Sequence, residues 1–158
     1  MTTRKVSYKG IALLAIAALM LAGCAQERQP DPTRIDLLLS ASPAANPDRN
    51  DRPSPVLVRV YELRSAGAFE TSDFFALLEQ DRGVLGAEML NRWEFQLAPG
   101  ETITLDTGFQ TDSAYIAVIA AFRDIERAQW RAISAVSPNQ VNRLSAMIGQ
   151  LDVTLQPR

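Results

Sequence analysis

The single cysteine of this chain of 158 residues, Cys24, lies in a sequence that specifies a covalent modification. It ends the run Leu21-Ala22-Gly23-Cys24, which has the form of a lipobox, where the thiol accepts a diacylglyceryl group and small residues admit the signal peptidase. The run follows a basic amino-terminal segment and the apolar residues 11–21, too short for a spanning helix, which needs about 20 residues. We predict that residues 1–23 are a lipoprotein signal peptide. The alternative is an ordinary secretory signal with a stray cysteine.

The predicted lipid on Cys24 anchors the protein to a membrane without spanning it. Ala25 follows the cysteine, whereas an aspartate in that place is the usual signal for retention in the bacterial inner membrane. We therefore expect the protein on the periplasmic face of the outer membrane. That compartment is oxidising, but the lipid occupies the only thiol, so no disulfide is expected and stability must come from the core.

The residue types that carry most enzyme chemistry are missing. The chain has no histidine and no second cysteine, which excludes imidazole bases, serine–histidine and cysteine–histidine systems, and nearly all zinc, copper and haem sites. Glycosidase chemistry needs a pair of carboxylates, and the candidates are Glu62, Glu79, Asp81, Glu88, Glu94 and Asp124. Their spacing singles out no pair. We predict that the protein is not an enzyme and holds no metal and no cofactor besides the lipid on Cys24.

The charge of the chain restricts its partners. The formal net charge is −2, and the leader contributes three basic residues and no acid, so the chain from Cys24 onward carries −5. Phosphate backbones bind to basic faces, so no nucleic acid is expected as a partner. All basic residues after the leader are arginines.

Two segments follow the predicted leader. Residues 24–33 are polar and contain prolines, as expected for a tether, and residues 34–158 suffice for one domain. Alternating apolar residues predict a strand at 34–40, and the stretch 56–63 has apolar residues on both faces, which indicates a strand near the middle of a packed sheet. Further strands are expected at 93–97, 102–105, 115–122, 130–136 and within 141–155. Seven or eight short strands predict a mainly β protein, a two-sheet β-sandwich.

A small helical insertion is expected at about 70–90. Ser72 is placed to accept hydrogen bonds from the first turn, and Gly83 is a plausible end. Phe74, Phe75, Leu77 and Leu78 follow Ser72 at helical spacing, which is more typical of core packing than of a partner groove.

Several stretches, taken in order, resemble the TssJ (SciN) family, the outer-membrane lipoproteins of the bacterial type VI secretion system. The specific ones are Arg52-Pro53-Ser54-Pro55 leading into residues 56–63, and the helix start at residues 73–77. Further similarities are Asn46-Pro47-Asp48, Pro99-Gly100-Glu101, Ala121-Phe122-Arg123-Asp124 and Trp130-Arg131. Leu78 departs from the family, in which many members have an aromatic residue there.

The resemblance implies a transthyretin-like β-sandwich and a structural role in the membrane complex of the secretion system. Members bind the periplasmic C-terminal domain of the inner-membrane protein TssM, and through it TssL indirectly, with no small-molecule substrate. In the family the loop between the first two strands makes this contact. Here the implied partner-binding residues are Asn46, Pro47, Asp48, Arg49, Asn50, Asp51 and Arg52.

Two other functions stay open on the sequence alone. One is a periplasmic glycan-binding or cell-wall-acting lipoprotein, which needs a carboxylate pair in a cleft or exposed aromatic platforms such as Trp93 and Trp130. The other is a pilotin for a different envelope assembly.

Overall fold

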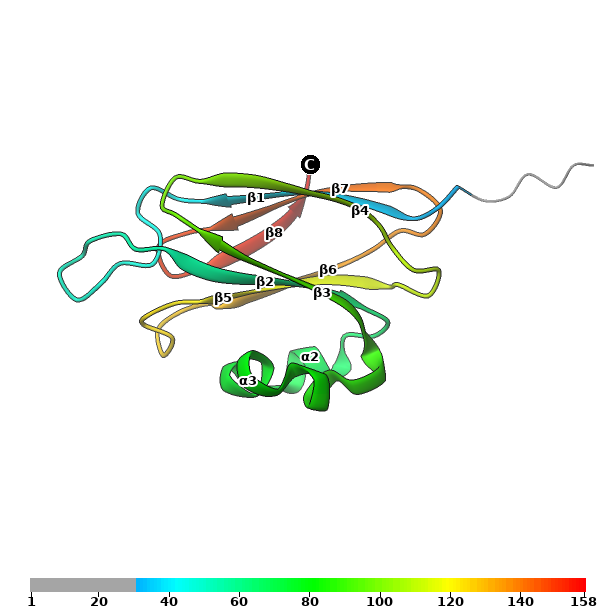
Figure 1. Cartoon of the computed structure of the whole chain (residues 1–158), viewed down its shortest axis with the longest axis horizontal. Helices are drawn as coiled ribbons and strands as arrows, with labels where there is room; N and C mark the ends of the chain where they lie inside the picture. The colour runs from blue at the N-terminus through cyan, green and yellow to red at the C-terminus, as the bar shows by residue number, and fades with distance from the viewer. Residues whose placement is uncertain (1–30) are drawn as a thin grey trace, which may run out of the picture. The chain divides into compact units, whose positions relative to one another are not determined.

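The computed structural model of the chain describes residues 31–158 (Figure 1). These residues form one of the two compact units of the chain, Asp31–Arg158. The predicted signal peptide, Cys24 and most of the predicted tether lie outside the described residues. Within residues 31–158, no helix combines the length and the apolar character needed to cross a bilayer.

The described part is a sandwich of two four-stranded sheets, which confirms the predicted fold class. One sheet has the order β4-β1-β7-β8, with bounds Thr102–Gly108, Arg34–Ala41, Val141–Ile148 and Val153–Pro157. The other has the order β3-β2-β5-β6, with bounds Met89–Leu97, Val56–Leu63, Tyr115–Ala121 and Arg131–Ala135. Only the pairing of β1 with β7 is parallel; the other named strand pairs are antiparallel.

The core between the sheets follows from the period-two alternation of β1 and β2. Ile35, Leu37 and Leu39 of β1 are fully buried, as are Val56 and its alternating neighbours on β2. Strand β2 lies between β3 and β5, which confirms its expected central place. Each strand thus contributes one face to the same core.

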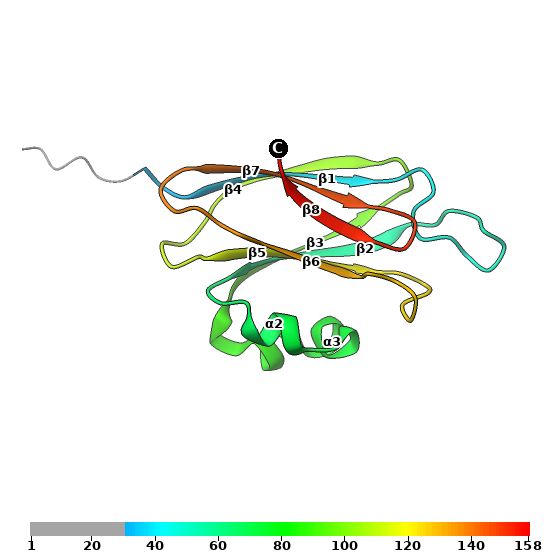
Figure 2. The same cartoon turned by 180° about the vertical axis from the view of Figure 1, so that it is seen from behind.

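The second sheet is covered on its outer face by the helical insertion (Figures 1 and 2). This insertion is the reason that β5 is buried on both faces, as its nearly unbroken apolar sequence predicts. Tyr61, Leu63 and Ile119 of the sheet pack with Phe69 and Leu77 of the helices in a second apolar cluster.

The insertion consists of α2 (Gly67–Thr71), α3 (Phe74–Leu85) and the 3-10 turn η2 (Gly86–Glu88). The N-cap of α3 is Asp73, whose carboxylate accepts a hydrogen bond from the N–H of Ala76, so the predicted cap at Ser72 is wrong. Ser72 instead follows α2, and its hydroxyl donates to the carbonyl of Ala68. The helix also runs past Gly83, because Gly86, at φ 49°, is the glycine in the left-handed region.

The expected core stripe of α3 is only partly right. Phe74 and Leu77 are buried, together with Asp81 and Leu85 at the following helical positions. Phe75 is 57% exposed, because it lies about 100° around the helix from Phe74, away from the sheet.

Two arginines of the second sheet hold the insertion in place. The guanidinium of Arg59 donates to the carbonyl of Leu78 at 2.6 Å, two residues before the non-helical Gln80 interrupts α3. Arg131 donates to the carbonyls of Phe69 and Ser72 at 3.0 and 2.8 Å, at the end of α2. These bonds pair main-chain carbonyls of the insertion with side chains of the sheet, which ties the two together.

The chain turns at Pro99-Gly100, with Gly100 at φ 81°. This turn carries the chain from β3 in one sheet to β4 in the other. Gly100 N–H donates to the carbonyl of Ala41 at 3.0 Å, which fixes this crossing beside the end of β1.

The burial pattern predicts opposite outcomes for two substitutions of the same kind. Val58→Asp should unfold the domain, since a carboxylate buried without a partner costs several kcal/mol against a total stability of about 5–15 kcal/mol. Phe75→Asp, on the exposed face of α3, should melt within a few degrees of the wild type. Thermal melts followed by circular dichroism measure both. A Val58→Asp variant with an unchanged melting temperature would contradict the assignment of the core.

Candidate partner-binding site at one end of the sandwich

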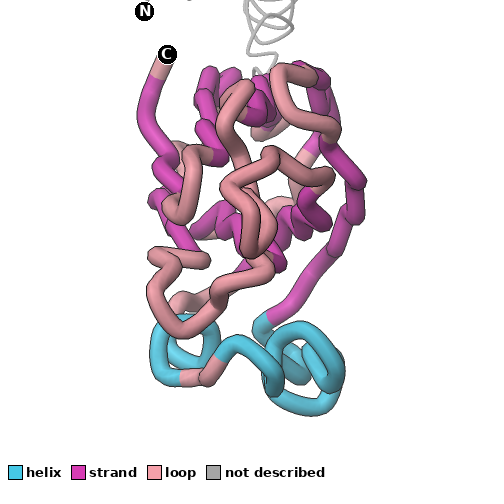
Figure 3. The backbone as a smooth tube through the Cα atoms, turned by 90° about the vertical axis from the view of Figure 1, so that its left-hand side faces the viewer, coloured by secondary structure: helices cyan, strands magenta, loops and turns pink. Residues whose placement is uncertain are grey.

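The loop between β1 and β2, residues 42–55, extends from one end of the sandwich (Figure 1, cyan). Figure 3 looks onto this end. The loop is closed on itself by backbone hydrogen bonds from Asp48 N–H to the carbonyl of Arg52 at 2.8 Å and from Ser54 N–H to the carbonyl of Ala45 at 3.1 Å. It is therefore an ordered structure with its own hydrogen bonds, although no strand or helix is assigned to it.

The carboxylate of Asp48 organises the tip of the loop. It accepts hydrogen bonds from the N–H groups of Asn50 and Arg52, at 2.8 and 3.0 Å, and from the Nε of Arg52 at 2.8 Å. The hydrogen bond from the Arg52 side chain, and those from the two backbone amides, lower the pKa of Asp48 to about 2. The ionised carboxylate is thus the form that holds the tip together.

Asn46 fixes the base of the loop. Asn46 is only 2% exposed, and its backbone adopts φ 50°, a conformation that asparagine tolerates better than most residues. The side-chain Nδ2 donates to the carbonyl of Pro55 at 2.7 Å, and Oδ1 accepts from the N–H of Arg123 at 2.8 Å. The backbone N–H of Asn46 donates to the carbonyl of Gln150 at 3.1 Å. One residue therefore joins the loop to two segments far away in sequence.

The structure brings the seven predicted partner-binding residues into one loop but gives them different surroundings. Arg49, Asn50, Asp51 and Arg52 are exposed at the tip, and Pro47 and Asp48 are half-buried. Asn46 is enclosed by the domain itself, so we assign it a positioning role. The surface available to a partner in this loop is therefore the tip.

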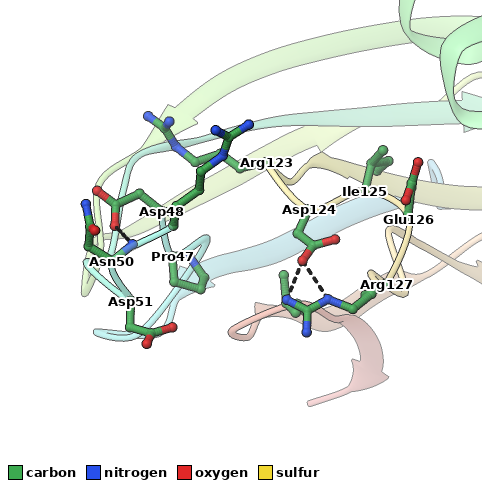
Figure 4. A pocket seen from close by; sticks show the side chains of 11 residues that line it. Pro47, Asp48, Asn50, Asp51, Arg123, Asp124, Ile125, Glu126 and Arg127 are labelled. Carbon is green, nitrogen blue, oxygen red and sulfur yellow. Dashed lines mark hydrogen bonds and ion pairs between the residues drawn. The ribbon is translucent and has the colours of Figure 1, made fainter.

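A second segment lies beside the loop and is not among the predicted partner-binding residues. Residues 123–127, between β5 and β6, face the loop across a groove of about 930 Å³ (Figure 4). In this segment Arg127 Nε donates to Asp124 Oδ2 at 2.6 Å, and this contact lowers the pKa of Asp124. The sequence run 121–124 contributes to the family resemblance, but only the pairing of β5 with β2 shows that it lies next to the loop.

Five of the six candidate carboxylates for glycosidase chemistry accept hydrogen bonds within the domain, and Glu79 is exposed on α3. Glu62 is buried and accepts from the N–H of Gln110 at 2.6 Å, and Asp81 accepts from Arg92 at 2.6 Å. Glu94 accepts from Arg59 at 2.6 Å. A glycosidase acid needs a raised pKa, whereas the groove residue Asp124 has a lowered one. Among residues 31–158 no cluster of side chains with metal-ligand chemistry is present.

The described domain is similar to solved lipoproteins of type VI secretion systems. Crystallographic TssJ1 from Pseudomonas aeruginosa, a T6SS lipoprotein, superposes with a TM-score of 0.78 at 31% identity, covering 80% of this chain and 97% of that one. Lip from Serratia marcescens, described as a membrane-bound component of the type VI secretion system, superposes with a TM-score of 0.73 at 28% identity, covering 80% and 98%. The described domain thus has the fold of type VI secretion lipoproteins.

Residues 33–156 match the family model described as type VI secretion lipoprotein, VasD, EvfM, TssJ. The chain belongs to this family. A structure described as the T6SS protein TssM C-terminal domain from EAEC contains a chain that shares the fold, with a TM-score of 0.64 at 22% identity over 79% of this chain and 98% of that chain. The comparison with curated proteins finds no match.

The pKa of Asp48 gives a direct test of the loop tip. In the folded protein the carboxylate of Asp48 should titrate with a midpoint of about 2, and Arg52→Gln should move this midpoint up towards the ordinary value of 3.8. Because the folded pKa is depressed, the contribution of this carboxylate is present above the ordinary value and is lost as the pH falls towards 2. Carbon-detected NMR titration measures it. A wild-type midpoint near 3.8 would show that the Asp48 contacts do not form in solution.

Proposed function

We propose that this protein is a structural outer-membrane lipoprotein of the type VI secretion membrane complex, anchored through a lipid on Cys24 and facing the periplasm. Its partner is the periplasmic C-terminal domain of TssM, and through it TssL indirectly. The contact is made by the loop between β1 and β2. The observation that carries the proposal is that this loop is ordered and exposes charged side chains at its tip, within a chain of the type VI secretion lipoprotein family.

Strand β1 separates the β1–β2 loop from the point where the described chain enters the sandwich. The chain enters the sandwich at Arg34 and reaches the loop after Ala41, at the other end of β1 (Figure 1). Eight residues of strand span roughly 26 Å. We propose that the loop end of the domain meets the partner, which comes from the inner membrane.

Preorganisation of the tip favours binding by this loop. The backbone bonds at Asp48 and Arg52 fix the tip before a partner arrives, and Pro53 and Pro55 restrict the segment that returns to β2. Ordering the loop then costs little free energy on association. The exposed charges of Arg49 and Asp51 act on orientation and on the association rate, so salt should weaken the binding.

The structure does not favour the glycan-binding alternative. Trp93 stacks on Phe109, with ring centroids 6.0 Å apart, and packs against the core. Trp130 contacts Phe74 edge-on at 5.3 Å, and the guanidinium of Arg131 lies 4.7 Å from its ring centroid. Neither indole is a free platform for a sugar ring, and the groove beside the loop is lined by no aromatic residue.

Replacement of the tip alone should separate binding from folding. Removing all of residues 46–52 would delete the Asn46 and Asp48 contacts, so the better variant replaces Arg49, Asn50 and Asp51 by Gly-Ser-Gly. We expect a melting temperature within a few degrees of the wild type, since closure entropy is unchanged at constant loop length. Affinity for the purified TssM periplasmic domain should fall at least about tenfold, which is 1.4 kcal/mol.

The matched control replaces Ser137, Asn139 and Gln140, exposed residues at the other end of the sandwich, by glycine and serine. Surface-based binding assays compare the variants, and pull-downs from solubilised envelopes identify the main partners. Unaltered affinity of the tip variant would move the interface elsewhere. Dominant co-purification of a different outer-membrane assembly would support the pilotin alternative.

A further inference from the structure

The groove beside the β1–β2 loop has a second wall that the proposed function leaves unassigned. Its first wall is formed by residues 47–51 of the loop and its second by residues 123–127, with Leu151 of the β7–β8 turn also lining it (Figure 4). Its volume, about 930 Å³, is at the upper end of the range of ligand pockets, about 300–1,000 Å³. The groove is therefore large enough for a segment of a partner chain.

The two walls are held at a fixed spacing in the absence of a partner. Asn46 Oδ1 accepts from the N–H of Arg123, so the base of the loop is bonded directly to the start of the second wall. Gln129 N–H donates to the carbonyl of Leu151 at 2.8 Å, and Val153 N–H donates to the carbonyl of Gln129 at 2.9 Å. Gln129, two residues after the second wall, thus bonds this part of the chain to the β7–β8 turn that supplies Leu151.

The charges in the groove are mixed and partly uncommitted. Asp124 is paired with Arg127, and Asp48 with Arg52. In the described part of the chain, Arg49, Arg123, Asp51 and Glu126 take part in no ion pair. The groove therefore offers two positive and two negative side chains to a partner, one of each sign on each wall.

The groove also contains apolar side chains among its charged ones. Ile125 and Leu151 are half-buried and line the groove between the charged residues. The hydrogen bond and charge of Asp124 raise the pKa of Arg127, and Asp51 on the first wall adds the smallest contribution. A partner that enters here meets both walls at once.

We infer that residues 123–127 form a second half of the docking surface, and that the groove takes an extended segment of the partner with an aliphatic side chain flanked by charges of both signs. The inference rests on the proposed function. The aliphatic side chain would contact Ile125 and Leu151, and charged neighbours would pair with Arg123 and Glu126. A polyanion such as a nucleic acid or an anionic lipid surface requires a single sign of charge, which this groove does not present.

The test inverts the uncommitted charges of the second wall in the full-length lipoprotein, with the double substitution Arg123→Glu and Glu126→Arg. The net charge, the Asp124–Arg127 pair and the backbone bond from Arg123 to Asn46 are all kept. A matched control makes the same exchange on α3, Glu79→Arg with Arg82→Glu, both exposed. If the double variant does not fold, Glu126→Arg alone takes its place.

We expect the affinity for the TssM periplasmic domain to fall about tenfold or more in the second-wall variant and to stay unchanged in the control. Loss of binding in the Gly-Ser-Gly tip variant together with unchanged binding in the second-wall variant would overturn this inference and leave the proposed function standing. Unchanged binding in both variants would overturn both. Weakened binding in the α3 control alone would assign the docking surface to the helical insertion.

Discussion

The side-chain amide of Asn46 holds together the end of the sandwich that carries the β1–β2 loop. It bonds to Pro55 within its own loop and to Arg123 in the loop after β5, and its backbone N–H bonds to Gln150 in the turn after β7. Being 2% exposed, the amide can satisfy its polar atoms only through these partners. Three segments that are distant in sequence are thereby kept at fixed positions around the groove.

Buried polar contacts play the same role on the other side of the molecule. The chain has no cysteine after Cys24, so no disulfide holds the helical insertion to the sheet. Arg59 and Arg131 do this by donating to helix carbonyls, and the phenol of Tyr61, whose pKa burial raises to about 12, donates to the carbonyl of Leu77 at 3.3 Å. The apolar core gives the bulk of the stability, and these polar contacts determine where the helical insertion lies on the sheet.

The sequence predicted the parts of the fold that depend on local periodicity. The alternation in β1 and β2 gave the two faces of the core, and the unbroken apolar run of β5 correctly indicated burial on both sides. The cap at Asp73 was missed because Ser72 is an equally good cap in isolation, and the choice depends on where α2 ends. Phe75 was misplaced because adjacent aromatics cannot both face the sheet, and the register of the helix is set by tertiary packing.

The candidate site was predictable as a loop but not as a surface. Family resemblance pointed to residues 46–52, and the prolines around them marked a segment outside the strands. The buried state of Asn46 and the apposition of residues 123–127 come from the pairing of strands across the sheet, which no local pattern encodes. The family resemblance implies a partner contact for Asn46, and its burial could not be read from the sequence.

The substitution Asn46→Gly tests whether the partner binds a loop that Asn46 already holds in position. Glycine accepts φ 50° without strain, so the substitution removes the two side-chain bonds and leaves every residue of the tip unchanged. The measurement is the affinity of this variant for the TssM periplasmic domain, alongside its melting temperature. We expect a folded domain with clearly weakened binding. A folded Asn46→Gly variant that binds as tightly as the wild type would contradict this expectation.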